Sequence, residues 1–433
     1  MRANIPWGSD SELEFELPDG WRLSGTVVPA TPSVVGDVPD EMSRALAKPV
    51  GSPPLFELCR GRRTAAVVVD DTSRPTPAHL FMGNLLEELI RSGMAREDIT
   101  LVTGTGTHRA MTEEEMEAKV GREVAGAFRW MNHDCHDAGM LSRLGRTSRG
   151  TPVEINRTVA EADLVVLVGT IEPHPQAGFG GGYKNILPGV AGKETIGRNH
   201  LLSATRENYG MVGWEPADNP MRLDIEEAGG MLKGACFMVN TVLSPDLRIS
   251  RIVAGDPVEA HREGMSYSRS LYGVEVASRA DVVISSSHPM DHDLRQGVKA
   301  IANTFMAAHE GGLVIAAMRC EGGAGDMGVP KLKFPDAPRL VRGLAHMLLP
   351  VVKHAPGIPV EERFYLYTAL RTVLRQRVII YAPGIPVEVR MRFPGFCSLV
   401  SFQQTIEDAA RQIPEASVLV FPMGGVTYPI VRQ

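Results

Sequence analysis

The sequence is poor in cysteine and has no long apolar run. Its five cysteines are scattered over 433 residues, and no two of them form a CxxC pair. This pattern excludes a disulfide-stapled framework and favours reduced thiols in a cytoplasm. No stretch approaches the roughly 20 apolar residues of a membrane helix, and the N-terminus has no apolar export segment. We therefore expect a cytoplasmic protein without a membrane partner.

Blocks of basic residues are also absent. The formal net charge is -6, and no cluster of Lys and Arg is interleaved with aromatic residues. Nucleic acid is therefore not expected as a partner. Hydrophobic content of 43% and charged content of 22% are ordinary for a globular protein. The length favours two domains of roughly 150–250 residues.

The sequence does have a regular alternation of short apolar runs and longer amphipathic segments. The apolar runs predict strands at 64–71, 98–106, 162–173, 235–244, 248–255, 280–289, 313–319, 378–384 and 417–422. The amphipathic segments predict helices at 78–93, 112–121, 193–202, 293–312, 337–352, 360–377 and 402–413. This order predicts an α/β fold of two domains, residues 1–271 and 272–433, each a largely parallel sheet covered by helices.

Reactive side chains follow several of the predicted strands. Asp71 and Arg74 come after the first strand, His108 after the second and His174 after the third. The first strand of the second half is followed by "SSSHPMDHDLRQGVK". Ligands bind beyond the carboxyl ends of the strands in an open α/β sheet. The sequence therefore predicts an active site in a cleft between the two domains.

A glycine-rich loop follows His174 in the stretch "EPHPQAGFGGGYKN" and leads to Lys184. It is not a Walker A loop, because Tyr183 precedes the lysine and Asn185 follows it. "GTGTHR" is not a dinucleotide fingerprint either, because Arg109 takes the third glycine position. Glycines nevertheless let a backbone approach a ligand closely and expose N–H groups to an anion.

Two histidines at matching strand ends suit paired acid–base chemistry, because an unperturbed imidazole titrates near pH 6.5. Taken singly, His108, His174 and Lys184 are equally typical of ordinary surface or core residues. Two further groups are metal candidates, "HPMDH" at 288–292 and "NHDCHD" at 132–137. The first lacks the HExxH glutamate, and we interpret the second as a hydrogen-bonded turn.

Five segments between Asp70 and Lys299 together resemble the nickel-dependent lactate racemase family: "DDTSRPTP", "GTGTHRAMT", "EPHPQAGFGGGYKNILPGVAG", "GRNH" and "RQGVK". The resemblance implies a nickel pincer nucleotide, pyridinium-3,5-bisthiocarboxylic acid mononucleotide, which holds Ni(II) and is joined covalently to a lysine. Planar coordination by soft ligands suits Ni(II). The resemblance also implies accessory proteins that make the cofactor.

The same resemblance implies a role for each matching residue. Lys184 matches the covalent anchor and His200 the nickel ligand, while His108 and His174 match the two acid–base groups. Asp71 matches a contact to the ribose. The other matches are a cation near the reacting oxygen, glycines against the flat cofactor, and substrate contacts from the second domain: Arg74, Gly180, Gly181, Gly182, Gln296 and Lys299.

The implied reaction inverts C2 of a 2-hydroxy acid. The C2 hydrogen leaves as hydride, a 2-keto acid forms and reorients, and the hydride returns to its opposite face. Arg295 stands where lactate-acting members carry an aromatic residue. We therefore expect a substrate larger or more anionic than lactate, such as malate, 2-hydroxyglutarate or an aldonate.

Two other interpretations remain open from the residues alone. In one, Lys184 forms a Schiff base with pyridoxal phosphate and the glycine loop holds its phosphate. The sequence offers no evident carboxylate partner for the pyridine nitrogen of that cofactor. In the other, the protein is a non-catalytic carrier of nickel or a nucleotide, which would not need two acid–base histidines.

Overall fold

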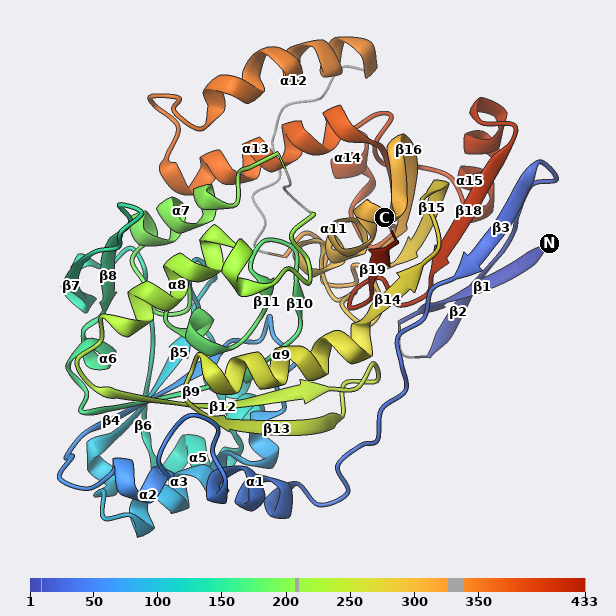
Figure 1. The fold of residues 1–433 in the computed structure, drawn as a ribbon. Coiled ribbons are helices and arrows are strands. Elements are labelled where there is room, and N and C mark those ends of the chain that lie inside the picture. Colours follow the sequence, from blue (N-terminus) through green and yellow to red (C-terminus); the bar gives the residue numbers. More distant parts are fainter. Residues whose placement is uncertain (9, 207–209, 326–337, 433) are drawn as a thin grey trace.

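The first of two large sheets fills the lower part of the molecule in Figure 1, a computed structural model that describes residues 1–8, 10–206, 210–325 and 338–432. Its strand order is β13-β12-β9-β4-β5-β6, and all neighbours are parallel except β12 and β13. Its strands are β4 (Ala65–Asp70), β5 (Ile99–Gly104), β6 (Arg129–Asn132), β9 (Leu164–Thr170), β12 (Ala235–Leu243) and β13 (Ile249–Gly255).

Helices cover both faces of this sheet. Alternate residues of β4 point to opposite faces, so Val67 and Val69 pack in one apolar cluster while Ala66 and Val68 pack in another. The first cluster is completed by α1 (Val38–Ala47), α2 (Leu55–Leu58), α3 (Met82–Arg91) and α4 (Glu113–Val120). The second is completed by α6 (Arg157–Glu161), α7 (Lys193–Leu202) and α8 (Pro220–Gly230).

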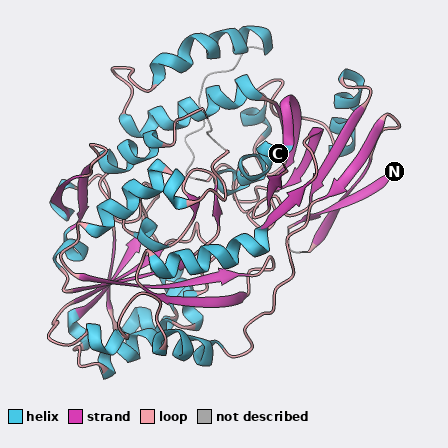
Figure 2. Cartoon of the chain, in the orientation of Figure 1, coloured by secondary structure: helices cyan, strands magenta, loops and turns pink. Residues whose placement is uncertain are grey.

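The second sheet is entirely parallel, with strand order β17-β16-β15-β18-β3. Figure 2 shows its strands as a separate magenta group beside the N-terminus. The strands are β3 (Trp21–Thr26), β15 (Ala280–Ser286), β16 (Ala308–Ala317), β17 (Arg377–Tyr381) and β18 (Ala416–Phe421). The helices of this half are α10 (Leu294–Gly297), α11 (Lys299–Thr304), α12 (Pro338–Val352), α13 (Val360–Arg375), α14 (Val387–Arg390) and α15 (Phe402–Gln412).

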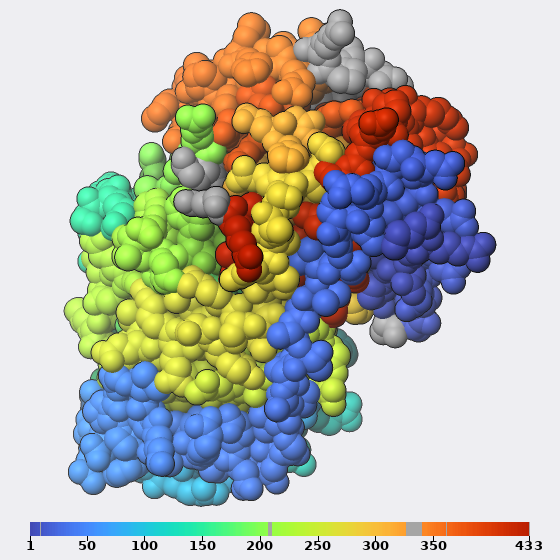
Figure 3. All heavy atoms as spheres, turned by 45° about the vertical axis from the view of Figure 1, so that its right-hand side comes forward, coloured from blue at the N-terminus to red at the C-terminus, as the bar shows by residue number. Residues whose placement is uncertain are grey.

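The N-terminal strands lie with the second sheet and not with the first. Strand β3 forms its edge beside β18, and the hairpin of β1 (Arg2–Trp7) and β2 (Ser11–Glu16) packs on the same apolar cluster. The chain then runs down the side of the molecule to α1, as the blue trace in Figure 1 and the blue surface strip in Figure 3 show. The division at residues 271/272 stays a prediction, and β3 pairs across it.

Most predicted elements are present in the structure. The strands predicted at 64–71, 98–106 and 162–173 correspond to β4, β5 and β9, and the helix predicted at 112–121 is α4, which begins with a capping box of Thr112 and Glu115. The helix predicted at 293–312 was too long, because β16 begins at Ala308, which pairs with Ala280 of β15. The helix predicted from residue 337 begins outside the described residues, and α12 is described from Pro338.

The remaining elements are short or connect the two sheets. They are α5 (Arg122–Ala127), α9 (Glu259–Tyr272), β7 (Leu141–Arg146), β8 (Pro152–Asn156), β10 (Pro173–His174), β11 (Gly178–Phe179), β14 (Gly273–Val276) and β19 (Tyr428–Val431). All five cysteines are free. Within the described part of the chain, no helix is both long and apolar enough to cross a bilayer.

Trp21 tests whether the N-terminal segment belongs to the second sheet. Its side chain is 5% exposed, and its Nε1 donates to the carbonyl oxygen of Ile413 at 2.8 Å. We expect Trp21→Ala to lower the free energy of unfolding by about 3–5 kcal/mol, because it leaves a cavity and an unpaired carbonyl. Urea unfolding measures this loss. Phe56→Ala, at a 44% exposed position, is the control, and an equal effect of both substitutions would contradict the assignment.

Candidate active site

Three parallel neighbours in the first sheet bring their carboxyl ends to one edge. Strand β4 ends at Asp70, β5 leads to His108, and β9 leads to Glu172 and His174. The residues after β15 reach this edge from the second sheet, because Lys299 of α11 contacts Glu172. The predicted convergence of strand ends therefore gathers polar side chains where the two sheets meet.

Asp71 and His108 form a buried pair at this edge. His108 Nδ1 lies 2.5 Å from Asp71 Oδ2, and Asp71 Oδ1 accepts a hydrogen bond from Ser73 Oγ at 2.5 Å. Burial alone would raise the pKa of Asp71, but His108, Ser73 and Arg74 outweigh it and lower this pKa to about 2. An ionised Asp71 accepts the Nδ1 proton, so neutral His108 carries a lone pair on Nε2. That atom is available as a base.

Glu172 joins cations from both sheets. Lys299 Nζ donates to Glu172 Oε1 at 3.0 Å, and Arg74 Nε lies 3.7 Å from the same oxygen. Burial would raise the pKa of Glu172, but Lys299 and Arg74 lower it overall, so the carboxylate is ionised at neutral pH. Its Oε2 has no hydrogen-bond partner among the described residues. This cluster thus joins two cations to one carboxylate, whose second oxygen can still accept a hydrogen bond.

His174 and Lys184 face each other inside the site. Lys184 Nζ lies 3.4 Å from His174 Nε2, and His174 Nδ1 accepts hydrogen bonds from the amides of Gln176 and Ala177. Neutral His174 therefore carries its proton on Nε2. Burial lowers the pKa of both side chains well below their usual values, and Arg74 and Lys299 add to this effect. An uncharged Lys184 amine is a nucleophile.

His200 lies on the predicted helix, which is α7 in the structure. Its Nδ1 donates to the carbonyl oxygen of Ile196 at 2.7 Å, which leaves the lone pair of neutral His200 on Nε2. Burial lowers the pKa of His200 to about 4, and nearby Lys184 and Arg295 add to this effect. The ring stands edge-on to Phe364 of α13, with 5.4 Å between ring centroids. An oriented, uncharged imidazole of this kind is a ready metal ligand.

The glycines of the loop are packed against the end of the first sheet. A Cβ added at Gly180 would meet the carbonyl oxygen of Thr170 at 2.9 Å, and one at Gly181 would meet Asn240 Oδ1 at 2.5 Å. One at Gly182 would meet the carbonyl oxygen of Pro257 at 2.9 Å. Gly181 and Gly182 also have positive φ. Close packing within the protein thus requires these glycines, and their contact with a cofactor stays a prediction.

Arg295 and Gln296 lie on the short helix α10, next to Lys299. Arg295 Nη2 donates to the hydroxyl of Tyr365 on α13 at 3.3 Å, and Arg295 is close enough to lower the pKa of His200. Gln296 is 8% exposed, and its Oε1 has no hydrogen-bond partner among the described residues. The structure therefore places Arg295 near His200 and Gln296 on the helical segment just before Lys299.

Two supporting side chains were missed by sequence reasoning. Glu172 opened the glycine-loop stretch but received no role. Lys119 of α4 is buried, lies 2.7 Å from Asp70 Oδ1 and donates to the carbonyl oxygen of Arg74 at 2.9 Å. This contact holds the loop that carries Arg74. The role of Lys119 follows from its buried position on α4. The sequence alone does not show which face of that helix is buried.

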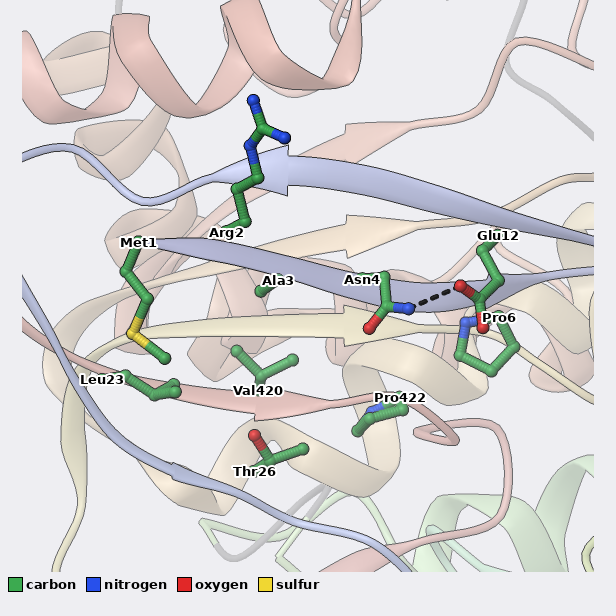
Figure 4. Close-up of a pocket in the computed structure, with 10 residues that line it drawn as sticks. All are labelled: Met1, Arg2, Ala3, Asn4, Pro6, Glu12, Leu23, Thr26, Val420 and Pro422. Carbon is green, nitrogen blue, oxygen red and sulfur yellow. Dashed lines mark hydrogen bonds between the residues drawn. The ribbon is translucent and has the colours of Figure 1, made fainter.

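The "NHDCHD" group makes hydrogen bonds within the fold. In "NHDCHD", the buried His133 uses Nε2 for the carbonyl oxygen of Ala191 at 3.0 Å and Nδ1 for the Asn156 amide at 3.4 Å. A cavity of about 330 Å³ lies between the N-terminal hairpin and β3, as Figure 4 shows. Two of the polar side chains that line it, Asn4 and Glu12, form a hydrogen bond with each other. It contains none of the site residues described above.

The fold and the site define an α/β enzyme whose reactive groups sit where the strands of two sheets end. The lactate racemase N-terminal domain family matches residues 8–211. The lactate racemase of Thermoanaerobacterium thermosaccharolyticum is 33% identical over 328 residues, covering 75% of this chain and 76% of that protein. The lactate racemase of Lactiplantibacillus plantarum is 32% identical over 294 residues, covering 67% and 68%.

Solved structures agree with these matches. The lactate racemase apoprotein from T. thermosaccharolyticum superposes with a TM-score of 0.84 at 26% identity and covers all of both chains. A protein from Thermotoga maritima has a TM-score of 0.68 at 19% identity, covers 94% of this chain and shows a shared fold. The chain belongs to the lactate racemase family, and it is therefore an isomerase.

Glu172 gives a direct test of the buried charge cluster. We expect Glu172→Gln to destabilise the fold by about 3–5 kcal/mol, because it leaves the buried Lys299 and the partly buried Arg74 without their carboxylate. Chemical unfolding measures the loss. Glu16→Gln removes an exposed ion pair with Arg2 and should change little. Equal stability of the wild type and Glu172→Gln would show that the cluster contributes nothing.

Proposed function

We propose that the protein is a racemase or epimerase that inverts C2 of a 2-hydroxy acid with a nickel pincer nucleotide. The observation that carries the proposal is the buried Lys184 amine, 3.4 Å from His174 and beside the Arg74–Glu172–Lys299 cluster. The family of the chain and the names of its relatives support it. We propose that it works in the cytoplasm and depends on accessory proteins that make the cofactor.

The donor set fits this cofactor. Lys184 is a buried amine whose pKa is lowered well below its usual range, which favours its nucleophilic form, and the hydrogen bond from His200 Nδ1 leaves the Nε2 lone pair of neutral His200 for nickel. Held by Lys184 and His200, the cofactor would supply a reversible hydride acceptor for the C2 hydrogen. The orphaned Oε2 of Glu172 and Oε1 of Gln296 mark hydrogen-bonding capacity that a ligand can use.

The chain's own residues handle the protons and the charge. His108 accepts the hydroxyl proton at Nε2, and Asp71 stabilises the imidazolium that results. Neutral His174 carries its proton on Nε2 and can donate a hydrogen bond from there to the substrate oxygen. Arg74 and Lys299 orient the anionic substrate and stabilise negative charge on its oxygen. The two neutral histidines thus present opposite tautomers, with a lone pair on Nε2 of His108 and a proton on Nε2 of His174, which suits inversion through a planar 2-keto acid.

The substrate we propose is larger or more anionic than lactate. Arg295 acts on His200, so it lies near the reacting centre, and it adds a third cation to Arg74 and Lys299. Glu172 offsets one of these charges. A second carboxylate or a row of hydroxyls in the substrate has a partner in the forked donors of Arg295.

The anchor and the nickel ligand can be tested separately. Intact mass of the protein from its native host should show an adduct that Lys184→Ala abolishes. His200→Ala should keep the adduct and lose bound nickel, measured by elemental analysis. Lys193→Ala, at an exposed position of α7, serves as the control. An adduct that survives in Lys184→Ala would refute the assignment.

Internal return of hydride predicts the fate of the C2 hydrogen. Substrate deuterated at C2 should keep its deuterium through inversion in ordinary water, as followed by NMR. Washout into solvent at the rate of inversion would instead indicate removal of a proton from C2. Single-turnover assays of His108→Asn and His174→Asn should each show loss of inversion, because each removes one of the two acid–base groups.

Arg295 should decide which 2-hydroxy acid is preferred. We expect enantiopure malate, 2-hydroxyglutarate or an aldonate to exceed lactate in kcat/KM. Arg295→Ala should reduce that preference about tenfold or more, as expected for the loss of a charged hydrogen bond. Arg198→Ala, on the exposed side of α7, should leave the ranking unchanged. The proposal fails if lactate is the best substrate, or if Arg295→Ala leaves the ranking intact.

A further inference from the structure

A buried arginine lies inside the glycine loop and has no role in the chemistry above. Arg222 of α8 is 1% exposed, and it is the largest fully buried side chain of the described residues. Its guanidinium donates to three backbone carbonyl oxygens, those of Ala177, Phe179 and Gly181. The backbone of the loop that leads to Lys184 is therefore wrapped around one cation.

The neighbouring carbonyl oxygens of the loop also accept hydrogen bonds. The Asn219 side chain donates to Gln176 at 2.8 Å, and the Gly213 amide donates to Gly178 at 3.0 Å. His261 Nε2 lies 2.8 Å from the Gly180 oxygen, while its Nδ1 accepts from Arg262, so Nε2 is the donor. Every carbonyl oxygen from residue 176 to 181 thus has a donor. A loop held in this way is rigid.

The burial of Arg222 is costly, which argues for a specific role. Among the described residues no carboxylate forms an ion pair with it, and its hydrogen bonds go to carbonyl oxygens. Burial lowers the pKa of Arg222 to about 10, although Glu226 acts in the opposite direction. A buried cation without a counter-ion costs several kcal/mol, whereas an apolar side chain would fill the same space without that cost. An apolar residue would, however, leave three carbonyl oxygens unpaired. The arginine is therefore suited to setting the shape of the loop.

Arg222 also acts on the turn that carries the lysine. The Gly181 oxygen accepts from Arg222 Nη1 at 3.2 Å and from the Lys184 amide at 3.3 Å. The short helical turn Gly182–Asn185 begins at this point. Arg222 is also one of the cations that, with burial and Arg74, lower the pKa of Lys184.

We propose that Arg222 is a positioning residue that fixes the carbonyl oxygens of the 177–181 loop and so presents the Lys184 amine at His174. It acts through the loop and does not touch the reacting atoms. The part of this proposal that concerns cofactor attachment rests on the proposed function of Lys184. The part that concerns the loop does not.

Hydrogen exchange of the full-length protein tests the loop directly. Arg222→Lys keeps the charge but loses the fork, and Arg222→Met loses both. In each variant we expect amides in peptides spanning residues 175–186 to exchange at least about tenfold faster, since one or more loop carbonyls lose their donor. Peptides from β9 and β12 should keep their protection. Arg251→Met, which removes an arginine from an ion pair with Glu263, is the control.

The second measurement is the fraction of protein that carries the adduct when it is made with the accessory proteins. We expect this fraction to fall at least about tenfold in Arg222→Met and less in Arg222→Lys. Unchanged exchange in the loop, or faster exchange spread evenly over the whole chain, overturns the proposal. Faster loop exchange with full adduct occupancy overturns its link to Lys184. If wild type and Arg251→Met both lack an adduct, the proposed function fails, while the exchange result still decides the loop.

Discussion

Glu172 is buried with one carboxylate oxygen between two cations that come from different parts of the chain. Lys299 lies 127 positions further on and belongs to the second half, whereas Arg74 follows β4 of the first sheet. Removing the charges of Glu172 and Lys299 from water, with Arg74 partly buried beside them, costs free energy. This cost is offset only if the three groups meet in good geometry. This requirement ties the end of β9 to the helices after β15. It therefore sets how the two halves of the site face each other.

The same cluster disfavours protonation of the neighbouring reactive groups His174 and Lys184. Arg74 and Lys299 are fixed beside His174 and Lys184, so further positive charge there is strongly disfavoured. Burial acts in the same direction and is the larger cause. The result is a site in which Arg74 and Lys299 face anions while protonation of the Lys184 amine and the His174 imidazole is disfavoured. Acid–base and nucleophilic roles depend on that separation.

Local sequence patterns predicted the positions of Asp71, His108 and His174, because each follows a buried apolar strand and parallel strands end at one edge. The residues that act on this site from other parts of the chain could not be predicted in the same way. Glu172 and Arg222 act on residues that only the folded chain brings near, and no local pattern distinguishes a buried arginine in an amphipathic helix from an exposed one. The N-terminal strands were missed for a related reason. β3 is a short segment with charged and polar residues, and its partner strand β18 lies about 395 positions later.

The glycine loop shows why tests against known phosphate-binding motifs could not identify it. Such motifs assume that a loop turns its amides toward an anion. Here the amide of Gly180 donates to the Glu172 carbonyl oxygen, and that of Gly182 donates to Asn240 Oδ1. The carbonyl oxygens are turned toward Arg222, His261 and the helices behind the loop. The glycines therefore allow the loop to pack closely on the sheet. Lys184 follows directly after this hydrogen-bonded loop.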